Sequence, residues 1–191
     1  MTAHLVCDIE TTGTEPGCCI LSIALVPVGI PEIEPFYETI SHEDSLIQGL
    51  HDELETLSWW DKQKTEAQTE AFSGTRKLRS VLESVSFYMD AVRELGLGGN
   101  QTLYLWGNGK DFDNVLLSAA YKRLGLKQPW DFRNNRCYRD LASYYPWIAK
   151  VKPEIPHHAL YDAKAEAAHL EMIFNELRQD ILPLVPGVSD G

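Results

Sequence analysis

The sequence lacks the features of membrane-spanning and secreted proteins. No apolar run approaches the roughly 20 residues that a helix needs to cross a bilayer, and we find no internal repeats or low-complexity segments. The first residues, Met-Thr-Ala-His, show no charged segment followed by an apolar one, which is the pattern of a secretory signal. We therefore expect a cytoplasmic protein with no membrane partner.

Cysteine is scarce, with 4 in 191 residues. The four positions have no zinc-ligand spacing, and two adjacent cysteines lie inside an apolar run: Cys7, Cys18, Cys19 and Cys137. We expect them to be reduced and mostly in the core.

Basic residues are also few, with 17 Lys and Arg against 28 Asp and Glu and a net charge of −11. This balance argues at first against a nucleic-acid partner, since binding to the phosphate backbone relies on Lys and Arg. The charge is unevenly distributed, however. Residues 32–70 carry a net charge of −9, whereas residues 109–152 carry +5. Net charge alone therefore does not exclude a polyanionic substrate.

Length and hydrophobic pattern predict one α/β domain at residues 1–180, followed by a tail at 181–191. Strands joined by short turns at the beginning of the chain are most simply an antiparallel meander, and helices alternate with strands later. A mixed sheet flanked by helices follows from this order. We expect strands at 4–10, 18–28, 33–41 and 101–106, and helices within 42–74 and at 75–95, 112–124, 138–145 and 159–178.

The first strand ends in Cys7-Asp8-Ile9-Glu10-Thr11-Thr12-Gly13. Because side chains alternate along a strand, Asp8 and Glu10 point to the same side. Two neighbouring carboxylates repel each other, and a divalent cation with oxygen ligands is the natural partner for both. The alternative is a strand end whose carboxylates are solvated.

Two further acidic positions follow on predicted helices. Asp113 begins the helix after a glycine-rich turn, where an acid is often only a cap and where Asp111 is the more natural cap. Asp162 borders an apolar stripe on the last helix, and His157 precedes it by five residues on the entering loop. An acid beside an apolar face more often needs a partner, whereas a lone His is usually a surface or capping residue.

The ordered set Asp-x-Glu-Thr-Thr-Gly, Phe-Asp-Asn-x-x-Leu and His-x-Ala-Leu-x-Asp-Ala resembles the three exonuclease motifs of the DEDDh family. These are 3′→5′ exonucleases with a ribonuclease H-like fold. The resemblance covers residues 4 to about 178. The small size and the Leu57-Ser58-Trp59-Trp60 segment look most like a phage and bacterial exoribonuclease subgroup.

The resemblance implies roles for individual residues. Four carboxylates would hold two Mg²⁺ or Mn²⁺ ions: Asp8, Glu10, Asp113 and Asp162. His157 would be the general base in preference to His158, because the family motif places the His five residues before the Asp. Four further positions would contact the substrate: Thr11, Thr12, Gly13 and Trp106. The family often has an Asn four residues before the second-motif Asp, where this chain has Gly109, so a role for Asn108 is doubtful.

The expected activity is metal-dependent 3′→5′ release of nucleoside 5′-monophosphates from single-stranded ends, with RNA favoured over DNA. One alternative is a docking module for a polymerase or a recombination protein. An endonuclease of the wider ribonuclease H-like class is disfavoured by the His-x-Ala-Leu-x-Asp motif. The subgroup resemblance suggests a homodimer. Trp59, Trp60 and Trp106 could each stack on bases or pack in the core.

Overall fold

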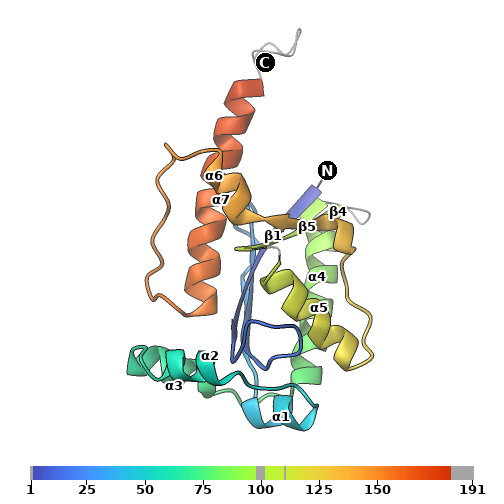
Figure 1. Cartoon of the computed structure of the whole chain (residues 1–191). Helices are drawn as coiled ribbons and strands as arrows, with labels where there is room; N and C mark the ends of the chain where they lie inside the picture. Colours follow the sequence, from blue (N-terminus) through green and yellow to red (C-terminus); the bar gives the residue numbers. More distant parts are fainter. Residues whose placement is uncertain (1, 98–101, 110, 182–191) are drawn as a thin grey trace.

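The computed structural model describes residues 2–97, 102–109 and 111–181, which form a five-stranded sheet with helices on both faces (Figure 1). The strand order is β3-β2-β1-β4-β5. The bounds are β1 Thr2–Thr11, β2 Ile20–Pro27, β3 Phe36–Thr39, β4 Thr102–Gly107 and β5 Asn135–Cys137.

The sheet is mixed, as predicted. Strands β1, β2 and β3 form the expected antiparallel meander, with Asp8 of β1 opposite Ala24 of β2. Strands β4 and β5 continue the sheet in parallel with β1, and Val6 is the partner of Trp106. Because β1 and β4 run in the same direction, their carboxyl ends lie at the same edge of the sheet.

Side-chain alternation on β1 divides the core into two layers. Leu5, Cys7 and Ile9 pack with the layer of α4 (Leu78–Leu97) and α5 (Asp113–Arg123). Val6 packs on the opposite face, with α6 (Tyr138–Ser143) and α7 (Ala159–Ile181). Asp8 and Glu10 share the parity of Val6, so β1 presents both carboxylates to the α7 face.

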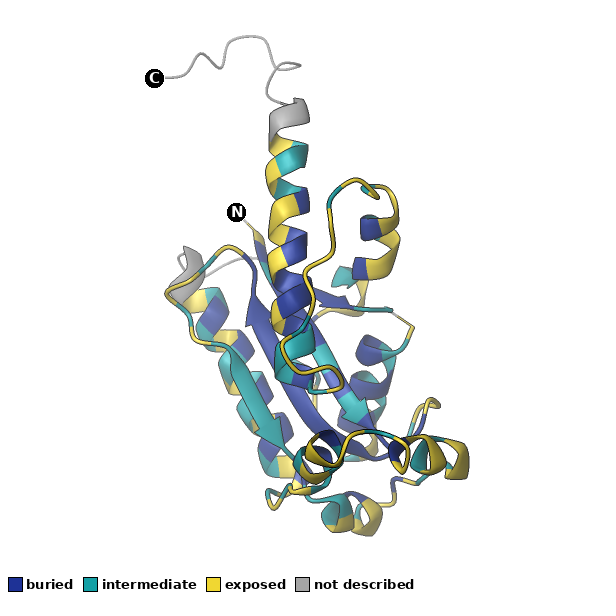
Figure 2. Ribbon diagram, turned by 90° about the vertical axis from the view of Figure 1, so that its left-hand side faces the viewer, coloured by how far each residue is buried: buried dark blue, intermediate teal, exposed yellow. Residues whose placement is uncertain are grey.

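Alanine side chains let α7 lie close to the sheet. Ala159, Ala163 and Ala167 are buried at successive turns of the helix and face the strands. Figure 2 shows this dark-blue stripe on a helix whose other side is exposed. The stripe places its neighbour Asp162 beside the end of β1.

The segment 42–74, predicted to be helical in its middle, contains three short helices: α1 His42–Ile47, α2 Leu54–Trp60 and α3 Thr65–Phe72. The spacing of Leu54, Leu57, Trp60 and Lys64 in the sequence predicts that they share one helical face, and this prediction is wrong. Leu54 is 81% exposed, Trp60 is buried, and Lys64 is the N-cap of α3. Trp60 thus packs in the core, where its Nε1 donates to the Thr11 carbonyl at 2.8 Å.

Several predicted boundaries differ from the observed ones. The helix predicted at 75–95 stops before three glycines that would end it, but α4 continues through Gly96, since a glycine weakens a helix by only about 1 kcal/mol. The other two glycines, Gly98 and Gly99, lie outside the described residues. The N-cap of α5 is Phe112, not Asp111. A 3₁₀ turn, η1 (Phe132–Asn134), precedes β5.

The predicted C-terminal tail, residues 181–191, lies outside the described residues except for Ile181, which ends α7. Within the described part of the chain, no helix combines the length and the apolar character needed to span a membrane.

Candidate active site

Strand β1 and helix α7 bring three carboxylates together. Asp8, Glu10 and Asp162 each offer an oxygen, and these oxygens all lie within 4.8 Å of one another. The backbone N–H of His158 donates to Asp162 Oδ2 at 3.2 Å, which fixes that side chain at the start of α7. A pair that is neighbouring in sequence and one distant residue thus form a single cluster.

Asp113 enters the same cluster from the start of α5. Its side chain is 2% exposed, and its Oδ2 has no hydrogen-bond partner. Asn114 ties this end of the helix to the sheet, since its Nδ2 donates to Leu105 O at 3.0 Å and to Asn135 Oδ1 at 3.2 Å. A Cβ at Gly107 would lie 2.8 Å from Asp113 Oδ2, so only glycine permits this close approach.

Glu166 is a fifth carboxylate, which the sequence motifs did not predict. It lies one helical turn after Asp162 on α7, is 8% exposed, and has an Oε2 without a hydrogen-bond partner. Its i+4 spacing from Asp162 was the available signal, because residues four apart share a helix face. Together these acids line a cavity of about 400 Å³, which we call the acidic cavity.

Burial raises the pKa of every carboxyl in this cluster, and repulsion from neighbouring acids adds to the rise for Asp8, Glu10 and Glu166. Burial, followed by repulsion from neighbouring acids, raises the pKa of Glu10 and of Glu166 to about 8. Burial raises the pKa of Asp113 to about 7, although backbone N–H groups oppose the shift. The pKa of Asp8 is raised well above its usual range by burial and by Asp113, and burial also raises the pKa of Asp162.

The cluster has the chemistry of a site for hard divalent cations. Its convergent donors are carboxylate oxygens, which Mg²⁺ and Mn²⁺ prefer over the softer donors. A buried carboxylate oxygen without a partner, as on Asp113, is unfavourable unless something positive approaches it. Bound divalent ions would supply that charge and lower the raised pKa values. The residues therefore fit the metal site implied by the sequence motifs.

His157 also lines the acidic cavity. Its φ is 61°, in the left-handed region, which non-glycine residues seldom adopt outside functional or strained positions. The Trp59 ring meets the His157 ring edge-on, with centroids 4.9 Å apart. His158 points elsewhere: its ring lies 4.8 Å from the rings of both Tyr37 and Tyr161.

A second cavity of about 390 Å³, the Trp59 pocket, adjoins the acidic cavity. Ile9, Glu10 and Phe112 line both. Thr11, Gly13 and Trp59 line only the second. Trp59 is 39% exposed, so it has a free surface at the pocket.

The Thr11–Gly13 turn is rigidly held. Thr11 Oγ1 donates to Gly13 O at 2.6 Å, and Thr12 is fully buried, with its backbone N–H donating to Cys19 O at 3.0 Å. A Cβ on Gly13 would lie 2.5 Å from Glu53 Oε1. Thr12 therefore supports the turn from beneath, whereas Thr11 and Gly13 reach the pocket.

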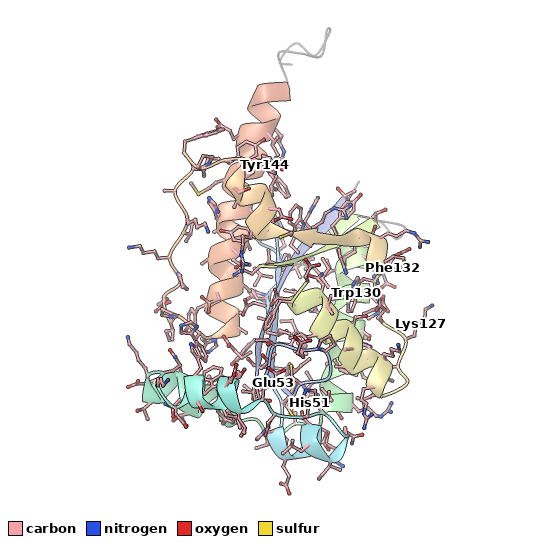
Figure 3. The ribbon with its side chains drawn as sticks, in the orientation of Figure 1. His51, Glu53, Lys127, Trp130, Phe132 and Tyr144 are labelled. Atoms are coloured by element: carbon pink, nitrogen blue, oxygen red, sulfur yellow. The ribbon has the colours of Figure 1, made fainter. Side chains whose placement is uncertain are left out.

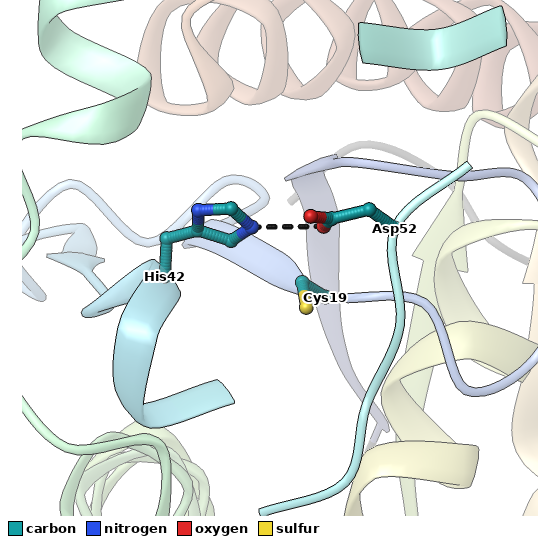
Figure 4. Close-up of side chains that lie close together, drawn as sticks. All are labelled: Cys19, His42 and Asp52. Carbon is teal, nitrogen blue, oxygen red and sulfur yellow. Dashed lines mark hydrogen bonds and ion pairs between the residues drawn. The ribbon is translucent and has the colours of Figure 1, made fainter. Parts of the chain in front are cut away.

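Behind this turn, Cys19, His42 and Asp52 form a compact polar group (Figure 4). His42 Nε2 and Asp52 Oδ1 are 2.8 Å apart, and the Cys19 side chain is buried beside them. The next residue, Glu53, donates its backbone N–H to Thr12 O at 2.9 Å and accepts from the N–H of Glu15. In Figure 3 the Glu53 side chain is labelled beside this part of the chain. The group thus anchors the loop that supports the Trp59 pocket.

Trp106 was predicted as a substrate contact and Asn108 was not, but only Asn108 lies at the acidic cavity. Trp106 is 7% exposed and packs against Phe174 of α7, with its Nε1 donating to His4 Nδ1 at 3.0 Å. The core-packing alternative therefore describes it, and we do not retain it as a substrate contact. Asn108, whose role was doubtful, does line the acidic cavity, and its carbonyl accepts from the Arg139 N–H.

Solved structures share this fold at low sequence identity. One is the nuclease domain of 3′hExo, a DEDDh family member, bound to rAMP, with a TM-score of 0.60 and 15% identity over 91% of this chain and 92% of that one. A full-length 3′-exonuclease has a TM-score of 0.59 and 15% identity over 91% and 82% of the two chains. Cell-death related nuclease 4 has a TM-score of 0.52 and 12% identity over 92% of this chain and 64% of that one. A search among curated proteins found no match.

The ribonuclease H-like fold and the motif-bearing site define a 3′–5′ exonuclease of the DEDDh type, which confirms the class expected from the motifs. Residues 3–174 match the model of the 3′-5′ exoribonuclease Rv2179c-like domain, and the chain belongs to this family. The phage and bacterial subgroup remains a prediction.

Proposed function

We propose that this protein removes nucleotides one at a time from the 3′ end of single-stranded RNA and releases nucleoside 5′-monophosphates. The observation that carries the proposal is the convergence of Asp8, Glu10, Asp113 and Asp162 on one cavity with His157 at its rim. The preference for RNA is supported by the exoribonuclease description of the family. One structural neighbour is a 3′-exonuclease in 3′-end-specific recognition of a histone mRNA stem-loop, with a TM-score of 0.58 and 14% identity.

The four carboxylates would hold two divalent ions, Mg²⁺ or Mn²⁺. When bound, such ions supply a nucleophile at neutral pH and stabilise the charge that develops on phosphate and leaving oxygens. Asp113 and Asp162 lie on separate helices, and Asp8 and Glu10 on the strand between them. The protein therefore contributes a preorganised oxygen cage, which costs no rearrangement during the reaction.

His157 would take the proton from the attacking water. Histidine is the side chain that most often serves as a general base in enzymes. His157 lines the cavity, and the Trp59 ring contacts its ring edge-on. The P–O bond to the departing 3′ oxygen breaks, so that the chain ends in a new 3′-hydroxyl and is shorter by one nucleotide.

The Trp59 pocket is the natural place for the terminal nucleotide. It shares Glu10 and Phe112 with the acidic cavity, so a nucleotide held there has its phosphate beside the carboxylates. The exposed ring of Trp59 offers a stacking surface for the base. Thr11 and Gly13 also line this pocket, where their backbone groups can contact the ribose.

The decisive experiment compares RNA and DNA oligonucleotides of one sequence, each incubated with Mg²⁺ or Mn²⁺, and identifies the products by chromatography. We expect 5′-mononucleotides, faster from RNA, and no release by Asp8→Ala. A 3′-blocked RNA is the matched substrate control. Cleavage of the blocked RNA would indicate an endonuclease, and no release by the wild type would contradict the proposal.

A further inference from the structure

A surface with basic and aromatic side chains begins at the acidic cavity and continues along the α6 side of the molecule. Arg139, on α6, is the only Lys or Arg among the described residues that line this cavity. After α6 the chain follows an irregular path over residues 144–158, which we call the α6–α7 loop. Figure 1 shows this loop running along α7 to the start of that helix, where Asp162 lies.

The loop exposes two large aromatic side chains. Tyr144 is 73% exposed and Trp147 is 65% exposed, although both are large enough to stabilise the core if they were buried. Figure 2 shows the loop largely exposed beside the buried stripe of α7, and Figure 3 places Tyr144 at the end of α6. Exposed aromatic rings beside basic residues are typical of proteins that bind single-stranded nucleic acids by stacking.

The charge of the loop contrasts with that of the whole chain. The charged side chains of the loop are Lys150, Lys152 and Glu154, a net charge of +1 in a protein whose net charge is −11. The strongly acidic segment, residues 32–70, includes α1, α2 and most of α3, which Figure 1 shows at the far end from α6. A polyanion approaching the cavity therefore meets less repulsion along α6 and the first part of the α6–α7 loop than over α1, α2 and α3.

The loop is anchored despite its irregular backbone. Tyr138 Oη lies 2.7 Å from His169 Nδ1, and His169 Nε2 lies 3.0 Å from the Ile148 carbonyl oxygen. His169 is on α7 and is 1% exposed, so this chain of hydrogen bonds fixes the middle of the loop from the core. A fixed loop loses little conformational freedom when it binds a ligand.

We propose that Arg139 and the α6–α7 loop hold the single-stranded body of the RNA, 5′ of the nucleotide being removed. The proposal rests on the proposed function, and it adds where the rest of the substrate lies. Tyr144 and Trp147 stack on unpaired bases, while Lys150 and Lys152 contact phosphates. The Trp59 pocket, by contrast, holds only the terminal nucleotide.

A substrate-length series tests this assignment. We would measure kcat/KM with Mn²⁺ on RNA oligonucleotides of two to sixteen nucleotides, for the wild type and for Tyr144→Ala/Trp147→Ala. With a stacking surface, wild-type kcat/KM rises with length, and the double variant is about tenfold or more slower on long substrates. On the dinucleotide, which cannot reach the loop, the variant equals the wild type. Phe87→Ala is the matched control, because Phe87 is 76% exposed on α4, across the sheet.

Binding provides a second readout that does not depend on turnover. Fluorescence anisotropy of a labelled ten-nucleotide RNA, with Ca²⁺ in place of Mn²⁺, is expected to show about tenfold weaker binding for the double variant. The logarithm of the binding constant falls linearly with the logarithm of the salt concentration, with a slope that reflects the number of phosphates neutralised. In Lys150→Gln/Lys152→Gln this slope should be smaller in magnitude by about 0.7 for each phosphate that a lysine no longer neutralises. Lys127→Gln, also exposed, is the control.

The outcomes separate the two proposals. Absence of hydrolysis by the wild type contradicts the proposed function, and the binding measurement then decides the surface. If wild type and double variant bind RNA equally and show the same dependence on substrate length, the α6–α7 loop does not bind the RNA. Tyr144 and Trp147 would then be candidates for contact with a partner protein. A fall in activity that is as large on the dinucleotide as on long RNA also overturns it.

Discussion

The buried carboxyl of Glu166 makes the free energy of unfolding of this protein depend on pH. Its pKa is raised from 4.5 to about 8, first by burial and then by repulsion from Asp113 and Asp162. Between those two pH values the folded protein keeps a proton that the unfolded chain has released. Each pH unit in this window therefore costs the folded state about 1.36 kcal/mol. The stabilisation is present below the unfolded pKa and is lost as the pH rises to the folded one.

Glu166→Gln removes this titration while keeping the shape of the side chain. The difference between a pKa of 4.5 in the unfolded chain and about 8 in the folded protein corresponds to about 5 kcal/mol. We therefore expect the variant, with EDTA present, to be more stable than the wild type by under about 1 kcal/mol at pH 5 and by several kcal/mol at pH 8.5. Urea unfolding followed by fluorescence at half-unit pH steps measures both curves.

The matched control is Glu171→Gln, an exposed acid on the same helix, which should follow the wild type at every pH. Divalent ions are expected to reverse the effect. Excess Mn²⁺ at pH 8.5 should stabilise the wild type, because a ligand of the folded state shifts the unfolding equilibrium. A Glu166→Gln difference that stays constant from pH 5 to pH 8.5 would refute the argument.

Three further predictions concern individual side chains. His157→Ala should lower kcat by about 10²-fold or more, as expected for removal of a general base, whereas His158→Ala should affect unfolding in urea more than it affects kcat. Trp106→Phe should lower the free energy of unfolding by about 1 kcal/mol, because the hydrogen bond to His4 is removed, while nucleotide release stays close to that of the wild type. A large fall in activity at unchanged stability would instead indicate that Trp106 contacts the substrate. Mn²⁺ should raise the melting temperature of the wild type at pH 8 and leave that of Asp8→Asn nearly unchanged, and equal shifts would place the ion elsewhere.

The hydrophobic pattern predicted most of the fold because each buried element has a local periodicity. It predicted the meander, the later strand and the long helices, since buried strands and amphipathic helices are readable over a few residues. It was less successful at 42–74, where three helices of six to eight residues replace one predicted region. Short helices depend on tertiary packing rather than on their own propensity, as the burial of Trp60 and the exposure of Leu54 show.

The shared face of Asp8 and Glu10 could be predicted from the sequence, because alternation along a strand is a local property. It also supplied the motif order that identified the DEDDh class. Only the tertiary structure brought Asp113 and Asp162 to that pair, added Glu166, and placed Trp106 in the core and Thr12 beneath the turn. It also separated His157 from His158, which are adjacent in sequence but have different surroundings. The physical reason is that burial and repulsion between distant carboxylates act through space, and contacts between β1, α5 and α7 exist only when the sheet and helices are packed.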